Sequence, residues 1–361
     1  MNASRVDTVV LCESYDEVAS ALDVIGAALR AHQHIAIVTF GNADLHELFV
    51  HLDRAMRWGA RVDFVPLFER AGLSSVLRER AYYRDAVARL TSGIDGAEVF
   101  FFTRYMNAPT QLFVMRLARR NAIVFRQVLD FEGLAPLGAR LTPAELARVA
   151  RQKVLFGRGF KFARAPHRLM DYMTNSFLLK HADTWFTPAE DQSLLRDFDF
   201  ADWSIWGQPP RPVLYFDQPL VQSDRVRAHE FREDMRAIFD VIARHLPEDA
   251  VGIKLHPGLH SARENAPYGV ELPRFIPAEA LYHPDVRMYL SFSSGAITRV
   301  RQGTVVSLLD LVRFVDANAK AYIKRRLIER SQVRVLFPQT LDDLDALVRS
   351  VAVPHALTPD A

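Results

Sequence analysis

The stretch DTVVLCESYDEVASALDVIGAALRAHQHIAIVTF, residues 7–40, decides the fold of the first half of the chain. Asp7–Cys12 and His34–Phe40 are short runs of apolar and β-branched side chains, and each predicts a strand. Between them, Asp16–Arg30 has apolar side chains three or four residues apart, which predicts a helix with one apolar face. A strand, a helix and a strand in this order predict a unit of two parallel strands joined by a crossover helix.

The same alternation continues through the first half of the chain. Further strands are expected at Arg61–Pro66, Ala97–Thr103, Ala122–Leu129 and Thr184–Thr187, and further helices at Asp44–Trp58, 74–92 and Pro109–Arg120. Val99–Phe102 is apolar at every position, which is typical of a strand covered on both faces. Strands alternating with helices predict a doubly wound parallel sheet.

A second α/β pattern follows the proline-rich stretch 206–212, which reads as a linker. Strands are expected at Val213–Phe216, Val251–Leu255, near Phe275, and at Val286–Phe292, Val305–Leu309 and Val333–Phe337. Helices are expected at His229–His245, from 294 to 301, and at Ala317–Arg330 and Thr340–Val351. The predicted fold is α/β, with two Rossmann-like halves facing a central cleft. We expect an N-terminal domain at 1–205, a C-terminal domain at 206–340, and a terminal helix and tail at 341–361.

Length and composition limit the classes of function. The chain has 361 residues, and 45 basic against 43 acidic side chains give a net charge of +2. This balance argues against a protein that coats nucleic acid through its overall charge, and no nucleic-acid partner is expected. The single cysteine, Cys12, excludes an intramolecular disulfide framework and a multi-cysteine zinc site. No apolar run approaches the roughly 18 residues that span a bilayer, so we expect a cytoplasmic protein, with peripheral association with the inner membrane left open.

The middle of the chain has a different character. Residues 134–176 show no clear strand pattern and predict loops and helix. Residues 148–168 carry seven basic side chains and no acid. The stretch is either a solvated helical face or a patch for an anionic glycan acceptor or an anionic membrane surface. The second interpretation uses Arg158, Lys161 and Arg164.

One candidate for chemistry is Lys254-Leu255-His256-Pro257-Gly258. The preceding strand ends here, and open α/β sheets bind ligands at the carboxyl ends of their strands. A histidine at this place can donate a proton to a phosphate leaving group. The alternative is chance, because a second His-Pro pair occurs at His283-Pro284.

Two serines, Ser293 and Ser294, follow the strand predicted at Val286–Phe292 and precede a helix start. Serine in this position caps free backbone N–H groups. The same position also binds phosphate, through those N–H groups and the helix dipole.

Two further strand exits complete the candidates. Asp130-Phe131-Glu132-Gly133 follows one strand and supplies either a general base or a solvated turn. Gln218 lies in the exit Tyr215–Leu220 of another strand. The spacing Asp197-Phe198-Asp199 reads as a loop, and no metal site is expected.

Four motifs at strand ends together resemble those of the bacterial sialyltransferases. In chain order they are the acidic-glycine turn at 130–133, Gln218-Pro219-Leu220, Lys254–Pro257 and Ser291–Ser294. The group that holds polysialyltransferases and lipooligosaccharide sialyltransferases is the most similar. The resemblance covers roughly residues 6–340 and implies a GT-B fold. It also implies an inverting, metal-independent glycosyltransferase with no cofactor. Such an enzyme moves sialic acid or a similar nonulosonic acid from its CMP donor to a glycan or glycolipid acceptor in surface polysaccharide synthesis.

The resemblance also implies roles for individual residues. His256 would contact the CMP phosphate and assist its departure, and Ser293 and Ser294 would bind the same phosphate. Lys254, Pro257 and Gln218 would belong to the donor site. The base would be Glu132, or Asp130 through a shifted backbone. Phe131 stands where the family's first acid is expected, which is a departure from the pattern.

Two alternatives remain at this level. One is a transferase for Kdo, another sugar carried on CMP. The other is a non-catalytic protein that binds glycans or polyanions on a transferase scaffold, and the departure at Phe131 motivates it.

Overall fold

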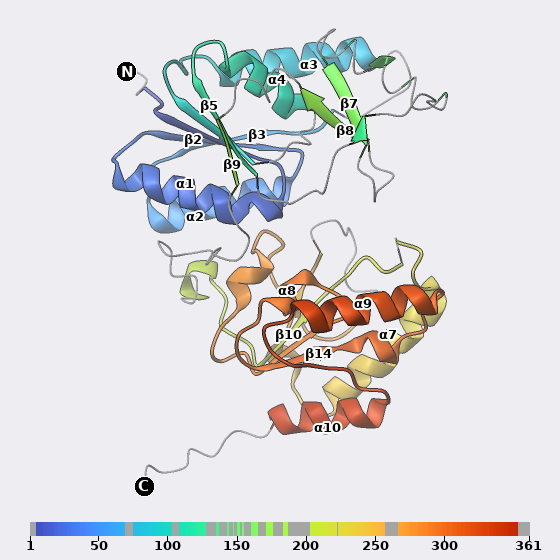
Figure 1. Cartoon of the computed structure of the whole chain (residues 1–361). Coiled ribbons are helices and arrows are strands. Elements are labelled where there is room, and N and C mark those ends of the chain that lie inside the picture. The colour runs from blue at the N-terminus through green and yellow to red at the C-terminus, as the bar shows by residue number, and fades with distance from the viewer. Residues whose placement is uncertain are drawn as a thin grey trace. The chain divides into compact units, whose positions relative to one another are not determined.

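A computed structural model (Figure 1) describes residues 5–68, 75–102, 108–127, 203–221, 223–256 and 266–352. Between 128 and 202 it describes residues 135–136, 143, 147, 150, 151, 154, 160–164, 171–175 and 183–186. The chain divides into two compact units, Met1–Asp199 and Phe200–Ala361. Each unit is described by itself.

The N-terminal unit contains a six-stranded sheet in which all paired strands are parallel. Its order is β3 (Arg61–Val65), β2 (Ile35–Phe40), β1 (Thr8–Cys12), β4 (Glu98–Phe101), β5 (Ala122–Gln127) and β9 (Asp183–Phe186). The first strand therefore lies in the middle of the sheet, and the direction of winding reverses between β1 and β4. This strand order is that of a Rossmann fold.

Helices cover both faces of this sheet. They are the 3₁₀ turn η1 (Tyr15–Glu17), α1 (Val18–Arg30), α2 (Ala43–Met56), α3 (Ser75–Leu90) and α4 (Ala108–Leu117). Figure 1 shows α1 and α2 on one face and α3 and α4 on the other. Every residue of β1 and β2 is buried, as expected for strands covered on both faces. The doubly wound sheet predicted from the sequence is confirmed.

A small antiparallel sheet corrects the prediction for residues 134–176, which expected no strand there. It pairs β6 (Ala135–Pro136), β7 (Phe160–Arg164) and β8 (Asp171–Asn175). The sequence of β7, FKFAR, begins with the alternation of apolar and polar residues that is typical of strands, and the surrounding glycines and charges obscured this signal. Lys161 and Arg164 thus lie in a strand and not on a helical face, whereas Arg158 lies outside the described residues.

The C-terminal unit repeats the Rossmann strand order. Its parallel sheet runs β12 (Val270–Glu271), β11 (Val251–Lys254), β10 (Val213–Phe216), β13 (Met288–Ser291), β14 (Thr304–Ser307) and β15 (Val335–Leu336). The strand expected near Phe275 is found at Val270–Glu271 instead. Phe275 packs against Trp206, with 6.5 Å between the ring centroids. Two Rossmann-like units in one chain confirm the α/β fold class predicted from the sequence.

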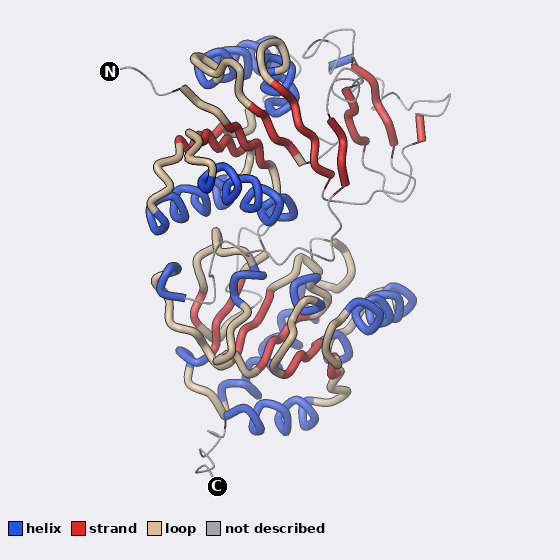
Figure 2. Tube along the Cα trace, turned by 60° about the vertical axis from the view of Figure 1, so that its left-hand side comes forward, coloured by secondary structure: helices blue, strands red, loops and turns tan. Residues whose placement is uncertain are grey.

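The helical elements of this unit flank the sheet (Figure 2). They are η3 (Trp203–Trp206), α7 (Ala228–Ala243), η4 (Glu248–Ala250), η5 (Ala278–Leu281), α8 (Gly295–Thr298), η6 (Leu308–Leu311), α9 (Ala317–Arg330) and α10 (Leu341–Ala352). Helix α10 packs against α7 and contributes Leu344, Val348 and Val351 to the apolar core. The terminal helix therefore belongs to the second unit, whereas the sequence analysis treated 341–361 separately.

The division between the units falls at Asp199/Phe200, a little before the expected position between 205 and 206. Trp203 and Trp206 explain the difference, because each is only 3% exposed. Trp203 packs against His283, with 5.9 Å between the ring centroids, and Trp206 against Phe275. Both side chains thus belong to the core of the C-terminal unit.

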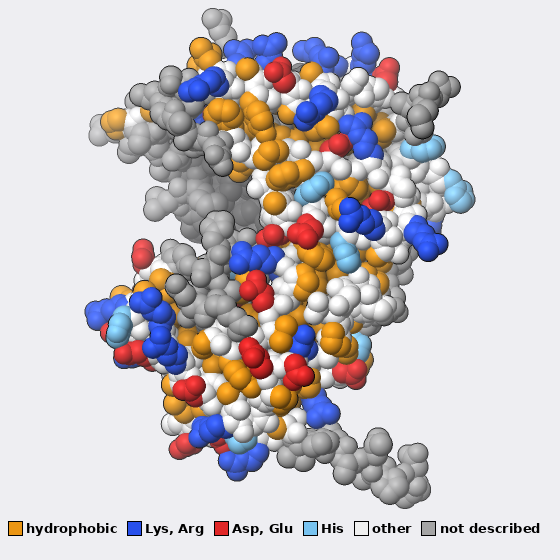
Figure 3. Space-filling view, turned by 180° about the vertical axis from the view of Figure 1, so that it is seen from behind, with side chains coloured by type: hydrophobic (Ala, Val, Ile, Leu, Met, Phe, Trp, Pro, Cys, Tyr) orange, Lys and Arg blue, Asp and Glu red, His pale blue; other side chains and the backbone are white. Residues whose placement is uncertain are grey.

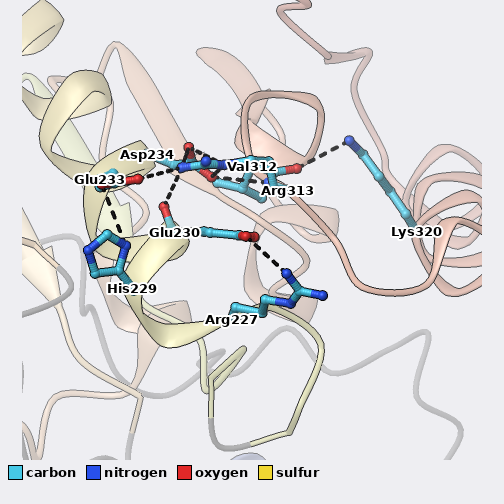
Figure 4. A network of polar contacts seen from close by, with 8 residues as sticks. All are labelled: Arg227, His229, Glu230, Glu233, Asp234, Val312, Arg313 and Lys320. Atoms are coloured by element: carbon cyan, nitrogen blue, oxygen red, sulfur yellow. Dashed lines mark hydrogen bonds and ion pairs between the residues drawn. The ribbon is translucent and has the colours of Figure 1, made fainter.

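A polar network ties the segment after η6 to helix α7 (Figure 4). The Arg313 guanidinium donates to Asp234 Oδ1 at 2.8 Å and to Glu233 Oε2 at 3.1 Å. It also donates to the backbone oxygen of Glu230 at 3.0 Å. The hydrogen bonds to Asp234 and Glu233 raise the pKa of Arg313. The network is exposed, so its role is to position a loop and it adds little to stability.

No helix among the described residues has the length and apolar character that crossing a membrane requires.

Candidate functional site

The candidate site lies at the carboxyl edge of the C-terminal sheet, where the winding direction reverses between β10 and β13. Phe216, the last residue of β10, pairs with Lys254 of β11 on one side and Ser291 of β13 on the other. Three loops therefore leave the sheet side by side. In open α/β sheets this is the place where ligands bind.

Gln218 and Ser293 meet across this reversal point. The Ser293 hydroxyl donates to Gln218 Oε1 at 2.5 Å, although the two residues are 75 positions apart. Both side chains are half-buried. Since the side-chain oxygen of Gln218 is used in this bond, its NH₂ group is left to donate, and it has no partner among the described residues. Two residues singled out independently in the sequence are thus brought together.

Two buried serines hold the neighbouring loops in place. Ser291 Oγ donates to the backbone oxygen of Phe216 at 3.0 Å, and Ser307 Oγ donates to that of Phe292 at 2.7 Å. Both serines are fully buried at the ends of β13 and β14. These bonds connect the ends of three neighbouring strands. Ser307 is not among the predicted site residues, although a serine that closes an apolar strand was a visible signal.

Ser294 caps α8, as the simpler sequence interpretation expected. Its Oγ accepts from the backbone N–H of Ala296 at 3.2 Å. The helix spans only Gly295–Thr298, which is shorter than the helix expected from 294 to 301. A helix of four residues has only a small dipole. A hydroxyl that accepts one bond keeps its proton, and the Ser294 O–H has no acceptor among the described residues. Of the two serines, Ser294 rather than Ser293 therefore has a hydroxyl proton to offer.

His256 leaves β11 on the other side of β10. It lies two residues beyond the last strand residue and is half-buried, and Pro257 lies outside the described residues. Lys254 itself is only 4% exposed, and its ammonium donates to the backbone oxygen of Arg274 at 2.7 Å. Lys254 thus holds the adjacent turn in place, which is a structural task at the edge of the site.

Asp217 is a buried carboxylate at this edge that is not among the residues predicted from the sequence. It is 2% exposed, its backbone N–H donates to the oxygen of Lys254 at 2.9 Å, and its Oδ1 accepts from Tyr215 Oη at 3.2 Å. Burial raises the pKa of Tyr215, and the charge of Asp217 raises it further. The sequence signal was an acid directly after the apolar strand β10.

The corresponding edge of the N-terminal sheet carries carboxylates. Glu17 is 3% exposed, and its Oε2 accepts from the backbone N–H of Glu13 at 2.7 Å, directly after β1. Asp130 and Glu132 follow β5 in the sequence and lie outside the described residues. Asp197 and Asp199 also lie outside them. Within the described part of the chain, no three His, Cys, Asp or Glu side chains gather as metal ligands would.

One member of the basic stretch 148–168 has a defined partner. The Arg151 guanidinium forms an ion pair with Glu79 of α3, whose side chain is 2% exposed. Arg151 is therefore neutralised locally and fixes its segment to the outer helix layer of the N-terminal unit. The roles expected for Arg158, Lys161 and Arg164 are not tested by these contacts.

Several solved structures align with this chain over most of its length. The calicheamicin glycosyltransferase CalG4 aligns over 98% of this chain and 91% of its own, at 14% identity and a TM-score of 0.37. UGT2 of Phytolacca americana, complexed with UDP-2-fluoro-glucose and pterostilbene, aligns over 96% and 90%, at 11% identity and 0.40. The UDP-GlcNAc 2-epimerase of Neisseria meningitidis aligns over 96% and 99%, at 10% identity and 0.39.

No protein-family model and no curated protein sequence matches the chain. The structural alignments above have TM-scores below 0.5, and they carry no argument about the activity. The fold assignment rests on the strand order and parallel pairing of the two sheets. Two Rossmann-like units in one chain are the building blocks of the GT-B glycosyltransferase fold.

Proposed function

We propose that this chain is a GT-B glycosyltransferase that uses a nucleotide-activated sugar, with the donor phosphate at the carboxyl edge of the C-terminal sheet. The observation that carries the proposal is the hydrogen bond between Gln218 and Ser293 at the reversal point of that sheet. It brings together two motifs that the resemblance to bacterial sialyltransferases assigned to the donor.

The groups at this edge suit a phosphate. The Gln218 amide and the Ser294 hydroxyl are donors without acceptors among the described residues, and His256 leaves the neighbouring strand. Donors fixed by the fold stabilise an anionic leaving group without reorganising during the reaction. A monophosphate leaving group such as CMP carries one phosphate. We propose that these donors stabilise it without a metal ion or other cofactor.

The proposed reaction is an inverting transfer of a nonulosonic acid. An acceptor hydroxyl attacks the anomeric carbon, the bond from that carbon to the phosphate oxygen breaks, and CMP leaves with the bonding electrons. His256 donates a proton to the departing phosphate, and a carboxylate of the N-terminal unit, Glu132 or Asp130, takes the proton of the acceptor hydroxyl. The acceptor in this proposal is a glycan or glycolipid of a surface polysaccharide.

Nucleotide binding tests the donor assignment directly. Calorimetric titration of the full chain with CMP and with UDP is expected to give tighter binding of CMP. A panel of CMP-activated sugars, including CMP-sialic acid and CMP-Kdo, then identifies the sugar from the rate of CMP release. Tighter binding of UDP, or binding of neither nucleotide, would contradict the CMP assignment.

The base variants separate an enzyme from a binding protein. Glu132→Gln and Asp130→Asn are expected to retain CMP affinity, and one of them is expected to lose CMP release by about 100-fold, the range typical of general acid–base catalysis. Undiminished release in both variants would remove the acidic motif from the mechanism. Tight CMP binding without turnover by the wild type, whatever the acceptor, would favour the non-catalytic alternative.

A further inference from the structure

Helix α3 presents an exposed face with an unusual composition. Its opposite face is buried and includes Tyr83, Val87 and Leu90. The exposed face carries the arginines of the helix: Arg78, Arg80, Arg84 and Arg89. The only exposed acid of the helix is Asp85, because Glu79 is buried and paired with Arg151.

The neighbouring helix extends this basic surface. Helix α4 packs against α3 on the same side of the sheet (Figure 1). Arg116, at its end, and Arg119 and Arg120 just beyond it are exposed. Residues 99–129 contain no acid that would balance them. Figure 3 shows several Lys and Arg side chains along one edge of the N-terminal unit.

None of these seven arginines has a carboxylate partner among the described residues. The ion pairs His34–Asp7, Arg61–Asp63 and Arg151–Glu79 of the same unit involve other side chains. In contrast, Arg313 and Lys324 of the C-terminal unit both bind carboxylates. The positive charge on α3 and α4 is therefore available to an external anion.

The exposed face of α3 also carries apolar side chains. Leu77 is 69% exposed, and Ala81 and Ala88 are exposed four and eleven residues further along the helix. These spacings place the three side chains on one line along the helix, which Arg84 shares, and the other three arginines of the helix lie on both sides of it. An exposed apolar strip between basic side chains is the pattern of a helix that lies in the plane of a membrane interface.

We infer that α3 and the end of α4 form a docking surface for an anionic lipid bilayer. The arginines bind lipid phosphates, and their aliphatic stems lie along the apolar strip while the charged ends reach the headgroups. Leu77 enters the acyl boundary. This apolar strip favours a bilayer over a nucleic acid or a polyanionic glycan, because those partners offer no apolar phase to bury Leu77. The inference is independent of the proposed transferase activity.

Vesicle sedimentation of the full chain tests the surface. Binding is expected to phosphatidylcholine vesicles containing about one-third phosphatidylglycerol, and much weaker binding to pure phosphatidylcholine. The double variant Arg80→Gln/Arg84→Gln is expected to lower the partition coefficient by roughly 25-fold, from ~5-fold per arginine. Leu77→Ser is expected to lower it by several fold without altering the charge.

A matched control uses two exposed arginines with the same spacing on α7, Arg232 and Arg236. Arg232→Gln/Arg236→Gln removes the same charge from the chain and is expected to leave vesicle binding unchanged. An equal loss in both double variants would overturn the docking surface, because only net charge would then matter. Failure to bind anionic vesicles, or binding of an oligonucleotide that Leu77→Ser leaves intact while vesicle binding is absent, would also overturn it.

Discussion

The two sheets of this chain share one topology and differ in the chemistry at their reversal points. In the N-terminal sheet, the loop after β1 is held by a buried carboxylate, Glu17, which accepts from the backbone of Glu13. In the C-terminal sheet, the loops after β10 and β13 meet through Gln218 and Ser293. The same strand order thus positions a buried carboxylate beyond the central strand of each unit, Glu17 and Asp217, but only the C-terminal unit adds the Gln218 and Ser293 pair. The strand order determines where the loops meet, and the residues just beyond the strands determine which groups a ligand would contact there.

The largest expected effect comes from His256, which follows β11 at the proposed donor edge. His256→Ala is expected to lower the rate of CMP release by about 100-fold or more, because proton donation to the leaving phosphate is lost. The control is His283→Ala. His283 also precedes a proline, but it lies before β13, at the opposite end of the strands. Turnover that persists in His256→Ala, or an equal loss in the control, would show that the donor edge does not act in this way.

A smaller effect is expected at Ser294, whose hydroxyl proton is available at the donor edge. Ser294→Ala is expected to weaken CMP binding by about 10-fold, since a hydrogen bond to a charged group contributes about 1.5–3 kcal/mol. Calorimetry measures the affinity. Ser294→Thr retains the hydroxyl and should restore most of the affinity, and replacement of the exposed Ser350 of α10, Ser350→Ala, should change nothing. Loss of affinity in the threonine variant as well would contradict a role of the hydroxyl, because threonine retains both the hydroxyl and the helix cap.

The buried hydrogen bond of Ser291 allows the stabilities of the two units to be compared. Ser291→Ala is expected to destabilise the C-terminal unit by about 1–2 kcal/mol, because the buried hydroxyl donates to Phe216 at 3.0 Å. Thr39 is the N-terminal counterpart, with a longer bond of 3.3 Å to the backbone oxygen of Asp63. Thr39→Val should cost less. Urea unfolding measures both variants, and a larger loss for Thr39→Val would reverse the expected ranking.

The smallest expected difference is in acid stability. In the C-terminal unit the pKa values of Asp343 and Asp345 are lowered, by a hydrogen bond from the Gln339 backbone and by one from His245 respectively. Burial would raise the pKa of Asp310, but bonds from Lys324 and Gln339 outweigh it and lower the value. In the N-terminal unit, a hydrogen bond from the His34 backbone lowers the pKa of Asp7.

A lowered carboxylate pKa stabilises the folded state above the unfolded pKa, and this stability is lost as the pH falls through the folded value. The C-terminal unit should therefore lose stability below about pH 4. Asp345→Asn should flatten this dependence. Acid titration followed by the near-ultraviolet signal of Trp203 and Trp206 reports on the C-terminal unit. A pH profile of Asp345→Asn identical to that of the wild type would argue against a role for this carboxylate.

Much of the fold could be predicted because its signals are local. The strands at Val213–Phe216 and Thr8–Cys12 are apolar runs, and α9 begins and ends at the predicted residues. The antiparallel strands β7 and β8 were missed, because pairing between them depends on contacts that a single segment does not reveal. Asp130 and Glu132 remain predictions, since no described residue tests them.

The sequence by itself determined the alternation of strands and helices and the residues at the strand exits. Periodicity and turn residues are properties of neighbouring positions, and they are readable without the fold. Only the tertiary structure decided which of these side chains have partners. The Ser293 hydroxyl donates to Gln218, the Lys254 ammonium donates to the backbone oxygen of Arg274, and the Ser294 hydroxyl proton has no acceptor among the described residues. The physical reason is that strand order joins segments 75 residues apart, and the partner of each donor depends on which loops meet at the sheet edge.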